Sequence, residues 1–238
     1  MTPIALLEVT LVAIGGGLLQ GSIGFGLGVF AVPFFLLIEP ALVPGPLLAA
    51  AFFITLVMTH HERHAIQVDD LKWALGGRLV GTVAALAVLT MVPPDRLPAL
   101  MGGLTLVAVA ITASGLQLRP APTSLIGAGA LSGFMSTAAS IGGPAIALLY
   151  QRETGARLRA TLSAFFLIGI VMSLVGLYLV HRFGRHEVLL TGMLLPGTAL
   201  GYLMARRVAP VLDRGYTRLA VLVVSAATAA AVVLKELL

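Results

Sequence analysis

The sequence contains no cysteine and little charge. Of its 238 residues only 11% are charged, whereas soluble domains have about a quarter. The absence of cysteine excludes disulfides, thiolate metal sites and a cysteine nucleophile. Acidic residues are especially few, with 10 Asp and Glu against 15 Lys and Arg. This shortage of charge excludes an ordinary soluble domain.

Long apolar runs take the place of the missing charge. The chain is 58% hydrophobic and has a mean hydropathy of +1.03. A helix needs about 20 apolar residues to cross a hydrocarbon core ~30 Å thick. Four stretches hold few or no charges: 3–38, 97–118, 120–151 and 160–180. We therefore expect an all-α integral membrane protein whose surroundings are a lipid bilayer. Its N-terminus lacks a basic leader region and is interpreted as the first span rather than a cleaved signal.

The basic balance of the chain does not indicate nucleic acid. The net charge is +5 and the isoelectric point about 10.2. However, Lys and Arg lie between apolar runs, where membrane topology requires them. No basic stripe with interleaved aromatics occurs, so no nucleic-acid partner is expected. No Gly-x-x-x-x-Gly-Lys-Ser/Thr pattern occurs either, and no cofactor is expected.

Charged and proline-rich breaks divide the chain into about eight apolar segments. Short matches recur in order at a nearly constant separation, which predicts two four-segment repeats, residues 1–118 and 119–238. The segments are 4–37, 41–59, 71–92, 97–117, 123–150, 160–181, 187–206 and 215–236. The matches are Gly17-x-x-Gln20-Gly21 with Gly129-x-x-Ser132-Gly133, Ala51-Phe52-Phe53 with Ala164-Phe165-Phe166, Gly81-Thr82 with Gly197-Thr198, and Asp95-Arg96 with Asp213-Arg214.

Topology is less well specified. With eight simple crossings, eight Lys and Arg against six favour both termini outside. The first segment, however, would be ~50 Å long as a straight helix, which is too long for one crossing. It must tilt, break or fold back. If it folds back, the two repeats become inverted, and the sequence leaves this open.

Glycine-rich runs occupy the first and fifth segments. One covers 15–28 and is followed by Pro33; the other covers 127–136 and continues through 140–144. Glycine costs about 1 kcal/mol in a helix interior, so we expect both helices to be interrupted, with the breaks facing each other near the bilayer midplane. Paired interrupted helices are the best sequence pointer to a transporter's binding site. Freed backbone amides at such breaks suit an anion.

Two interpretations of these glycines stay open, since small residues four apart also allow helices to pack closely. The candidate substrate-binding residues are Gln20, Gly21, Ser22, Gly24, Phe25, Gly26, Arg78, Ser132, Gly133, Ser136, Ser140, Gly142, Gly143 and Pro144.

Arg78 is the one cation clearly inside an apolar segment. Such a residue usually faces a cavity or a partner. It also lies about two turns from Lys72, so its side chain has the alternative of reaching the interface. The matching stretch 191–196 has no cation. We expect dipolar groups to hold the anion and Arg78 to tune its attraction.

Other ionisable groups fall mostly at segment ends. Glu8 is the only acidic residue that could carry a proton within a segment, so ion coupling through carboxylates is not visible. His60, His61 and His64 could bind a metal, but an interfacial location is favoured, and no metal site is expected.

The motifs resemble the sulfite exporter TauE/SafE family of bacterial and plant membrane transporters. The resemblance lies in Gln20-Gly21-Ser22-Ile23-Gly24-Phe25-Gly26, in Ser132-Gly133, in Gly142-Gly143-Pro144 and in Leu149-Tyr150. It implies transport of small sulfur-containing or organic anions, such as sulfite or sulfoacetate.

We therefore expect a secondary transporter of small anions in the bacterial cytoplasmic membrane, working by alternating access. Proton and sodium coupling, and a monomer and a homodimer, are equally open. The alternatives are an anion channel and a structural membrane subunit. An intramembrane serine protease is disfavoured, because Ser132 and Ser136 would need a nearby base and the only later histidines, His181 and His186, lie at a segment end.

Overall fold

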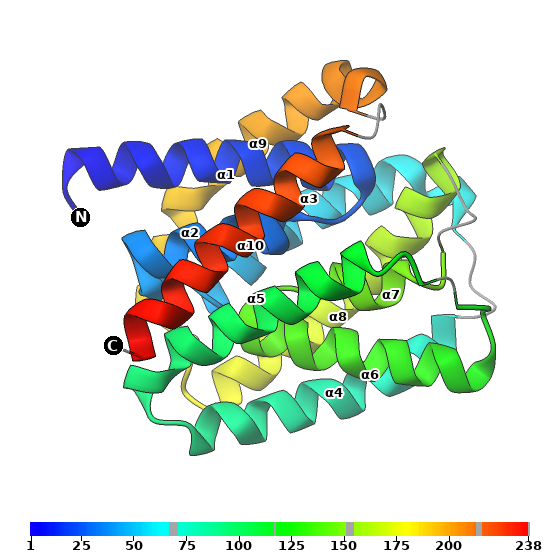
Figure 1. The fold of residues 1–238 in the computed structure, drawn as a ribbon. Coiled ribbons are helices and arrows are strands. Elements are labelled where there is room, and N and C mark those ends of the chain that lie inside the picture. Colours follow the sequence, from blue (N-terminus) through cyan, green and yellow to red (C-terminus); the bar gives the residue numbers. More distant parts are fainter. Residues whose placement is uncertain (67–70, 117, 151–154, 213–215, 238) are drawn as a thin grey trace.

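The computed structural model describes residues 1–66, 71–116, 118–150, 155–212 and 216–237. All of the regular structure in this part is helical, and both chain termini lie at the same end of the bundle (Figure 1). The helices are α1 (Pro3–Ile23), α2 (Leu27–Ile38), α3 (Gly45–Glu62), α4 (Leu71–Met91), α5 (Leu97–Ala113), α6 (Pro122–Ala139), α7 (Gly143–Ala147), α8 (Gly155–Leu179), α9 (Arg185–Leu212) and α10 (Tyr216–Leu237). Short 3-10 turns cover Pro40–Leu42, Arg63–Ala65 and Pro94–Arg96.

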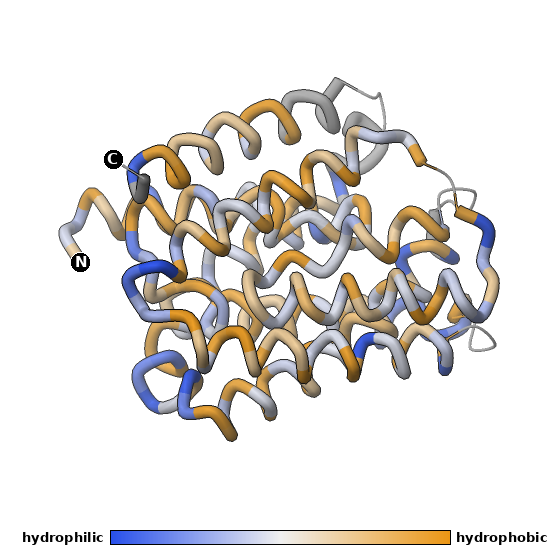
Figure 2. Tube along the Cα trace, turned by 60° about the horizontal axis from the view of Figure 1, so that its bottom comes forward, coloured by the Kyte–Doolittle hydropathy of each residue, from blue (hydrophilic) through white to orange (hydrophobic). Residues whose placement is uncertain are grey.

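Several helices are suited to a membrane. Five stretches within the described residues are long and apolar enough to cross it: Pro3–Ile23, Leu71–Met91, Pro94–Ala113, Arg157–Leu179 and Arg185–Ala205. Leu27–Ile38 and Leu222–Lys235 are apolar but shorter. Hydrophilic residues gather mainly at the two ends of the bundle (Figure 2). The expectation of an all-helical membrane protein is confirmed, with five candidate spans.

The first predicted segment is a hairpin and not a single crossing. Gly24 and Gly26 have φ angles of 95° and 119°, in the left-handed region that residues with a Cβ atom rarely adopt. The chain therefore turns back here, and α2 runs antiparallel to α1. A Cβ atom added at Gly15 would meet the Phe30 ring, 2.7 Å away. The simple eight-crossing topology is wrong for this segment, because two glycines allow a reversal that a continuous helix does not.

The fifth predicted segment is interrupted in the same way. Helix α6 ends at Ala139, and Ser140 adopts a left-handed φ of 60°. Its reversal is held by the Ile141 N–H, which donates to the Met135 carbonyl (3.2 Å). Helix α7 then starts at the Gly143-Pro144 pair, where a proline lacks an N–H that the first turn would leave unpaired. A second hairpin follows, since the Ser132 hydroxyl donates to the Gly142 carbonyl (2.6 Å).

Many other glycines serve close helix packing. Helix α4 packs beside α6, and α1 beside α9, each pair running parallel. A Cβ atom at Gly133 would lie 3.0 Å from the Cα atom of Arg78, and one at Gly17 would lie 3.0 Å from the Cα atom of Thr198. The packing interpretation thus holds for the small residues Gly17, Gly21, Gly129 and Gly133, which allow two backbones to approach.

The helix ends define two ends of the bundle. Helix α3 runs antiparallel to α8, because Gly45 lies beside Phe183 and Glu62 beside Arg159. We call the end where α3 finishes and α8 begins the cationic end, and the end that holds both termini the terminal end. The Asp213-Arg214 pair, used to recognise a repeat, lies outside the described residues.

A test of this packing compares two glycines of α4. Alanine at Gly81 would place its Cβ atom 2.7 Å from the carbonyl carbon of Ala130, whereas a Cβ atom at Gly76 meets nothing within 4 Å. We expect Gly81→Ala to destabilise the protein by about 1–3 kcal/mol, the range for overpacking. Gly76→Ala should be neutral or stabilising. Thermal unfolding in detergent measures the difference, and equal midpoints would contradict the α4–α6 contact.

Candidate functional site

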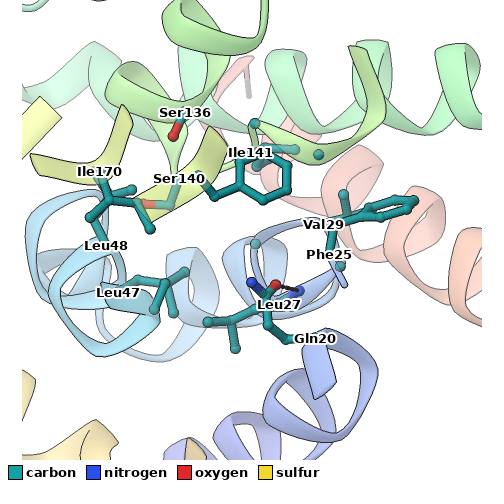
Figure 3. A pocket seen from close by; sticks show the side chains of 16 residues that line it. Gln20, Phe25, Leu27, Val29, Leu47, Leu48, Ser136, Ser140, Ile141 and Ile170 are labelled. Carbon is teal, nitrogen blue, oxygen red and sulfur yellow. Dashed lines mark hydrogen bonds between the residues drawn. The ribbon is translucent and has the colours of Figure 1, made fainter. Parts of the chain in front are cut away.

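A small cavity lies where the two helix breaks meet (Figure 3). It has a volume of about 40 Å³, and α3 and α8 complete its wall. The residues that line it are Gln20, Phe25, Gly26, Leu27, Gly28, Val29, Leu47, Leu48, Ala51, Ser136, Ser140, Ile141, Gly142, Gly143, Phe166 and Ile170. The two glycine-rich runs, more than 100 positions apart in the sequence, thus share one cavity.

The two breaks touch through glycine. A Cβ atom at Gly28 would lie 2.8 Å from the carbonyl carbon of Ser140, which is backbone and cannot move aside. One at Gly143 would lie 2.8 Å from the Cβ and Cγ atoms of Phe25. The breaks can cross at this distance only because these positions lack side chains.

Gln20 connects the two halves of the first hairpin. The Leu27 N–H, at the start of α2, donates to Gln20 Oε1 at 3.4 Å. The first N–H groups of a helix have no partner within the helix, and they make its N-terminus electropositive. Gln20 therefore satisfies one such amide beside the cavity. The start of α2, from Gly26 to Val29, lines the same wall.

Arg78 is completely buried next to this cavity. Its side chain has an exposed fraction of 0%, so the alternative of reaching the interface beside Lys72 is wrong. Its two terminal nitrogens donate to Ser132 Oγ (3.1 Å) and Ser136 Oγ (2.9 Å). Its guanidinium carbon lies 4.9 Å from the centre of the Phe165 ring, within cation–π range. No described acidic side chain pairs with it, so its charge is offset only by dipoles and aromatic faces.

Glycine also makes room for this guanidinium. A Cβ atom at Gly169 of α8 would overlap the Arg78 side chain. Nearby, the Thr137 hydroxyl bonds to Ser173 (2.8 Å) and to Thr82 (3.3 Å), which ties α4, α6 and α8 together. Arg78 is thus held on three helices at once.

Ser136 connects Arg78 to the cavity, because it accepts a hydrogen bond from Arg78 and lines the cavity wall. Its oxygen accepts a hydrogen bond from Arg78, so its own hydroxyl hydrogen remains to be donated. In the part of the chain that the structure describes, no acceptor takes that hydrogen. Ser136 lines the cavity, whereas Ser132 lies behind it and donates to the Gly142 carbonyl. The arrangement therefore offers a polarised donor to an anion.

Comparison with protein-family models matches residues 9–232 to one family, described as sulfite exporter TauE/SafE. The match covers nearly the whole chain. This protein belongs to the TauE/SafE family. It is therefore an integral membrane protein of a transporter family for sulfur-containing anions. Searches of curated proteins and of solved structures found no match to the chain.

The predicted substrate-binding residues of this TauE/SafE protein divide into three groups. Those that line the cavity are Gln20, Phe25, Gly26, Ser136, Ser140, Gly142 and Gly143. Arg78 and Ser132 form the layer behind it. The remaining predicted residues, Gly21, Ser22, Gly24, Gly133 and Pro144, do not line it.

The third group has structural surroundings of its own. Gly21 and Gly133 pack against neighbouring helices, Gly24 makes the turn of the first hairpin, and Pro144 starts α7. Ser22 is buried, and its hydroxyl finds no hydrogen-bond partner among the described residues.

The sequence prediction omitted several residues of the site. Gly28 belongs to the glycine run that was noted, and its contact with Ser140 is a property of the fold alone. Phe165 and Phe166 appeared only as a repeat match, yet both rings face the guanidinium of Arg78. Gly169 carried no signal beyond being a glycine in an apolar helix.

The contact between Phe25 and Gly143 can be tested by adding one methyl group. In Gly143→Ala the new Cβ atom would force the Phe25 side chain to shift, and the cavity that both residues line would change shape. We expect a folded protein that loses most of its anion flux in proteoliposomes. Gly103→Ala is the control, since a Cβ atom there meets nothing within 4 Å. Full flux in Gly143→Ala would separate this cavity from transport.

Proposed function

We propose that this chain is a secondary transporter that moves small sulfur-containing oxyanions, such as sulfite, across the bacterial cytoplasmic membrane by alternating access. One observation carries the proposal: a fully buried guanidinium, Arg78, stands beside a cavity at the meeting point of two broken helices, with no described acidic partner.

The charge of Arg78 favours an anion. A cation at the centre of a spanning helix costs about 2.5–3.5 kcal/mol on insertion scales. Two serine hydroxyls and two aromatic faces offset part of this cost. An anion in the cavity would offset more, because Coulomb attraction is strong where water is excluded. Arg78 then acts through its field and through Ser136, which donates directly.

The size of the cavity favours a compact ligand. A water needs about 10–15 Å³ of such space, so 40 Å³ corresponds to roughly three water positions. Sulfite, with four non-hydrogen atoms, suits this space better than a longer sulfonate such as sulfoacetate. A larger substrate would require the breaks to separate.

The arrangement of helices supports alternating access by two inverted repeats, residues 1–118 and 119–238. The hairpin of α1 and α2 corresponds to that of α6 and α7, and α3, α4 and α5 correspond to α8, α9 and α10. The pairing of α4 with α6 then has its counterpart in the pairing of α9 with α1. Related helices α3 and α8 run antiparallel, as an axis in the membrane plane requires.

The two repeats differ at the position of Arg78. Aligning Gly81-Thr82 with Gly197-Thr198 places Leu194 opposite Arg78. Leu194 is fully buried, so the second half contributes an apolar side chain where the first contributes a cation. One charge close to the pseudo-axis is enough to attract a single anion, and it avoids the tight retention that two would cause.

The two hairpins also bear on the orientation of the chain in the membrane. Each hairpin leads the chain back to the end of the bundle from which it started. With this path, eight described Lys and Arg positions lie at the cationic end and four at the terminal end. The positive-inside rule then assigns the cationic end to the cytoplasm and both termini to the outside. The eight are Arg63, Lys72, Arg119, Arg157, Arg159, Arg206, Arg207 and Arg218, and the four are Arg96, Arg182, Arg185 and Lys235.

Substitutions at Arg78 and Ser136 test the site. Ser136 would donate directly to the anion, and a hydrogen bond to a charged group is worth about 1.5–3 kcal/mol, so Ser136→Ala should weaken sulfite binding roughly ten- to hundredfold. Arg78→Gln removes the positive charge behind Ser136 and should also weaken sulfite binding. Radiolabelled sulfite binding and flux in proteoliposomes measure both. Ser114→Ala, at the exposed end of α5, is the control. Unchanged binding in folded Arg78→Gln would contradict the proposed site.

The absence of native cysteine allows the orientation to be tested directly. A cysteine in place of exposed His64 should react with a membrane-impermeant maleimide only when the cytoplasmic face is open to it. A cysteine in place of exposed Arg185 should react from outside in intact cells. The opposite pattern would reverse the assignment of the two ends.

A further inference from the structure

A second, larger hollow opens at the cationic end. It has a volume of about 370 Å³, and we call it the vestibule. The ends of α1, α3 and α9 and the start of α8 surround it. Its lining residues are Gly21, Met58, His61, Glu62, Arg159, Tyr202 and Ala205.

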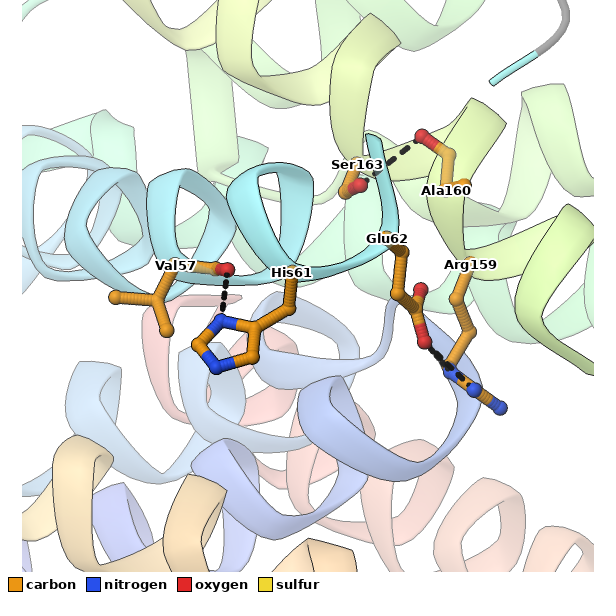
Figure 4. A network of polar contacts seen from close by, with 6 residues as sticks. All are labelled: Val57, His61, Glu62, Arg159, Ala160 and Ser163. Carbon is orange, nitrogen blue, oxygen red and sulfur yellow. Dashed lines mark hydrogen bonds and ion pairs between the residues drawn. The ribbon is translucent and has the colours of Figure 1, made fainter. Parts of the chain in front are cut away.

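An ion pair between Arg159 and Glu62 lies in the vestibule wall, and only one of the two carboxylate oxygens takes part in it (Figure 4). Arg159 donates from Nε (2.8 Å) and from a terminal nitrogen (2.6 Å), and both bonds go to the same oxygen, Oε1 of Glu62. The other carboxylate oxygen, Oε2, is buried and has no hydrogen-bond partner in the described ranges. A planar guanidinium is best matched by two oxygens of one anion. Glu62 satisfies this requirement only in part.

The vestibule lies directly beside the central cavity. Gln20 lines the cavity, whereas its neighbour Gly21 lines the vestibule. A Cβ atom at Gly24, in the turn of the first hairpin, would be 3.4 Å from the Cα and Cγ atoms of Arg159. The last turn of α1 and the following turn therefore form the partition between the two spaces, and Arg159 lies against it.

Building on the proposed transport function, we propose that Arg159 binds the substrate oxyanion in the vestibule and that Glu62 is a built-in competitor for it. A small oxyanion such as sulfite binds Arg159 only by displacing the Glu62 carboxylate. It would present two oxygens to the guanidinium, where Glu62 presents one. From this position the last turn of α1 lies between the anion and the cavity that Ser136 lines.

The exposure of the pair fits such an exchange. The side chains of Arg159 and Glu62 are 29% and 20% exposed, so solvent reaches the pair and screens part of its attraction. Arg78, by contrast, has no exposed surface and no carboxylate to displace. A competitor in the vestibule keeps the anion from being retained there, which a carrier requires if it is to pass its substrate on.

The test is a cycle of Glu62→Gln, Arg159→Gln and the double variant, with sulfite flux into proteoliposomes measured at constant pH. Removing the competing carboxylate should lower the half-maximal sulfite concentration about two- to fivefold in Glu62→Gln. Arg159→Gln should raise it. In the Arg159→Gln background, Glu62→Gln should have no effect, because the competition needs the guanidinium.

Arg63→Gln is the matched control, since Arg63 lies at the same end, does not line the vestibule and bonds to His64. It should leave the half-maximal concentration unchanged. If Arg159→Gln does not fold, Arg159→Lys replaces it, because lysine keeps the charge and loses the planar fork. Thermal unfolding verifies that each variant is folded.

The outcomes distinguish this inference from the proposed function. If the wild type transports sulfite and Arg78→Gln does not, but folded Glu62→Gln keeps or raises the half-maximal concentration, the vestibule site is wrong and the ion pair only joins α3 to α8. If the wild type transports no sulfite, the proposed function fails and the inference fails with it.

Discussion

The central constraint in this molecule is a guanidinium that cannot reach water. Arg78 lies among α4, α6 and α8 with no exposed surface. Its two terminal nitrogens donate to serine hydroxyls, whereas its Nε has no hydrogen-bond partner among the described residues. Ser132 and Ser136 receive two of its donors, the rings of Phe165 and Phe166 face it, and Gly169 leaves it space. Because none of these groups is an anion, the positive field extends into the adjoining cavity. An apolar interior that keeps such a charge is suited to bind an anion there.

Glycine has two different roles around this charge. Along the α4–α6 and α1–α9 contacts it removes side chains so that parallel helices approach closely. At Gly24 and Gly26 it supplies left-handed φ angles that reverse the chain, and at Gly28 and Gly143 it lets the two hairpins cross. The close packing fixes Arg78 against α6, while the reversals bring backbone amides and Gln20 to the same place. Both roles are therefore needed to build one small polar site in an apolar bundle.

The central cavity and the vestibule lie on either side of the last turn of α1. The central cavity is small, whereas the vestibule is larger and lies at the end richer in Lys and Arg. The turn from Gln20 to Gly24 separates the two spaces. It ends at Gly24, which has a left-handed φ angle. The related turn of the second hairpin, at Ser140, lies on the other side of the cavity, where its hydroxyl donates to the Pro44 carbonyl (2.8 Å).

The sequence by itself determined the class of the protein and the position of its breaks. Scarce charge, apolar runs of spanning length and dense glycine were sufficient, because lipid imposes these constraints on any short stretch of chain. Only the tertiary structure decided that the first segment folds back, that Gly21 and Gly133 serve packing, and that Arg78 stays buried behind Ser136. These depend on contacts between residues far apart in the sequence. Whether a glycine meets a ligand or a neighbouring backbone, and whether an arginine reaches water or a serine, is settled by which helices lie beside it, and no local pattern carries that information.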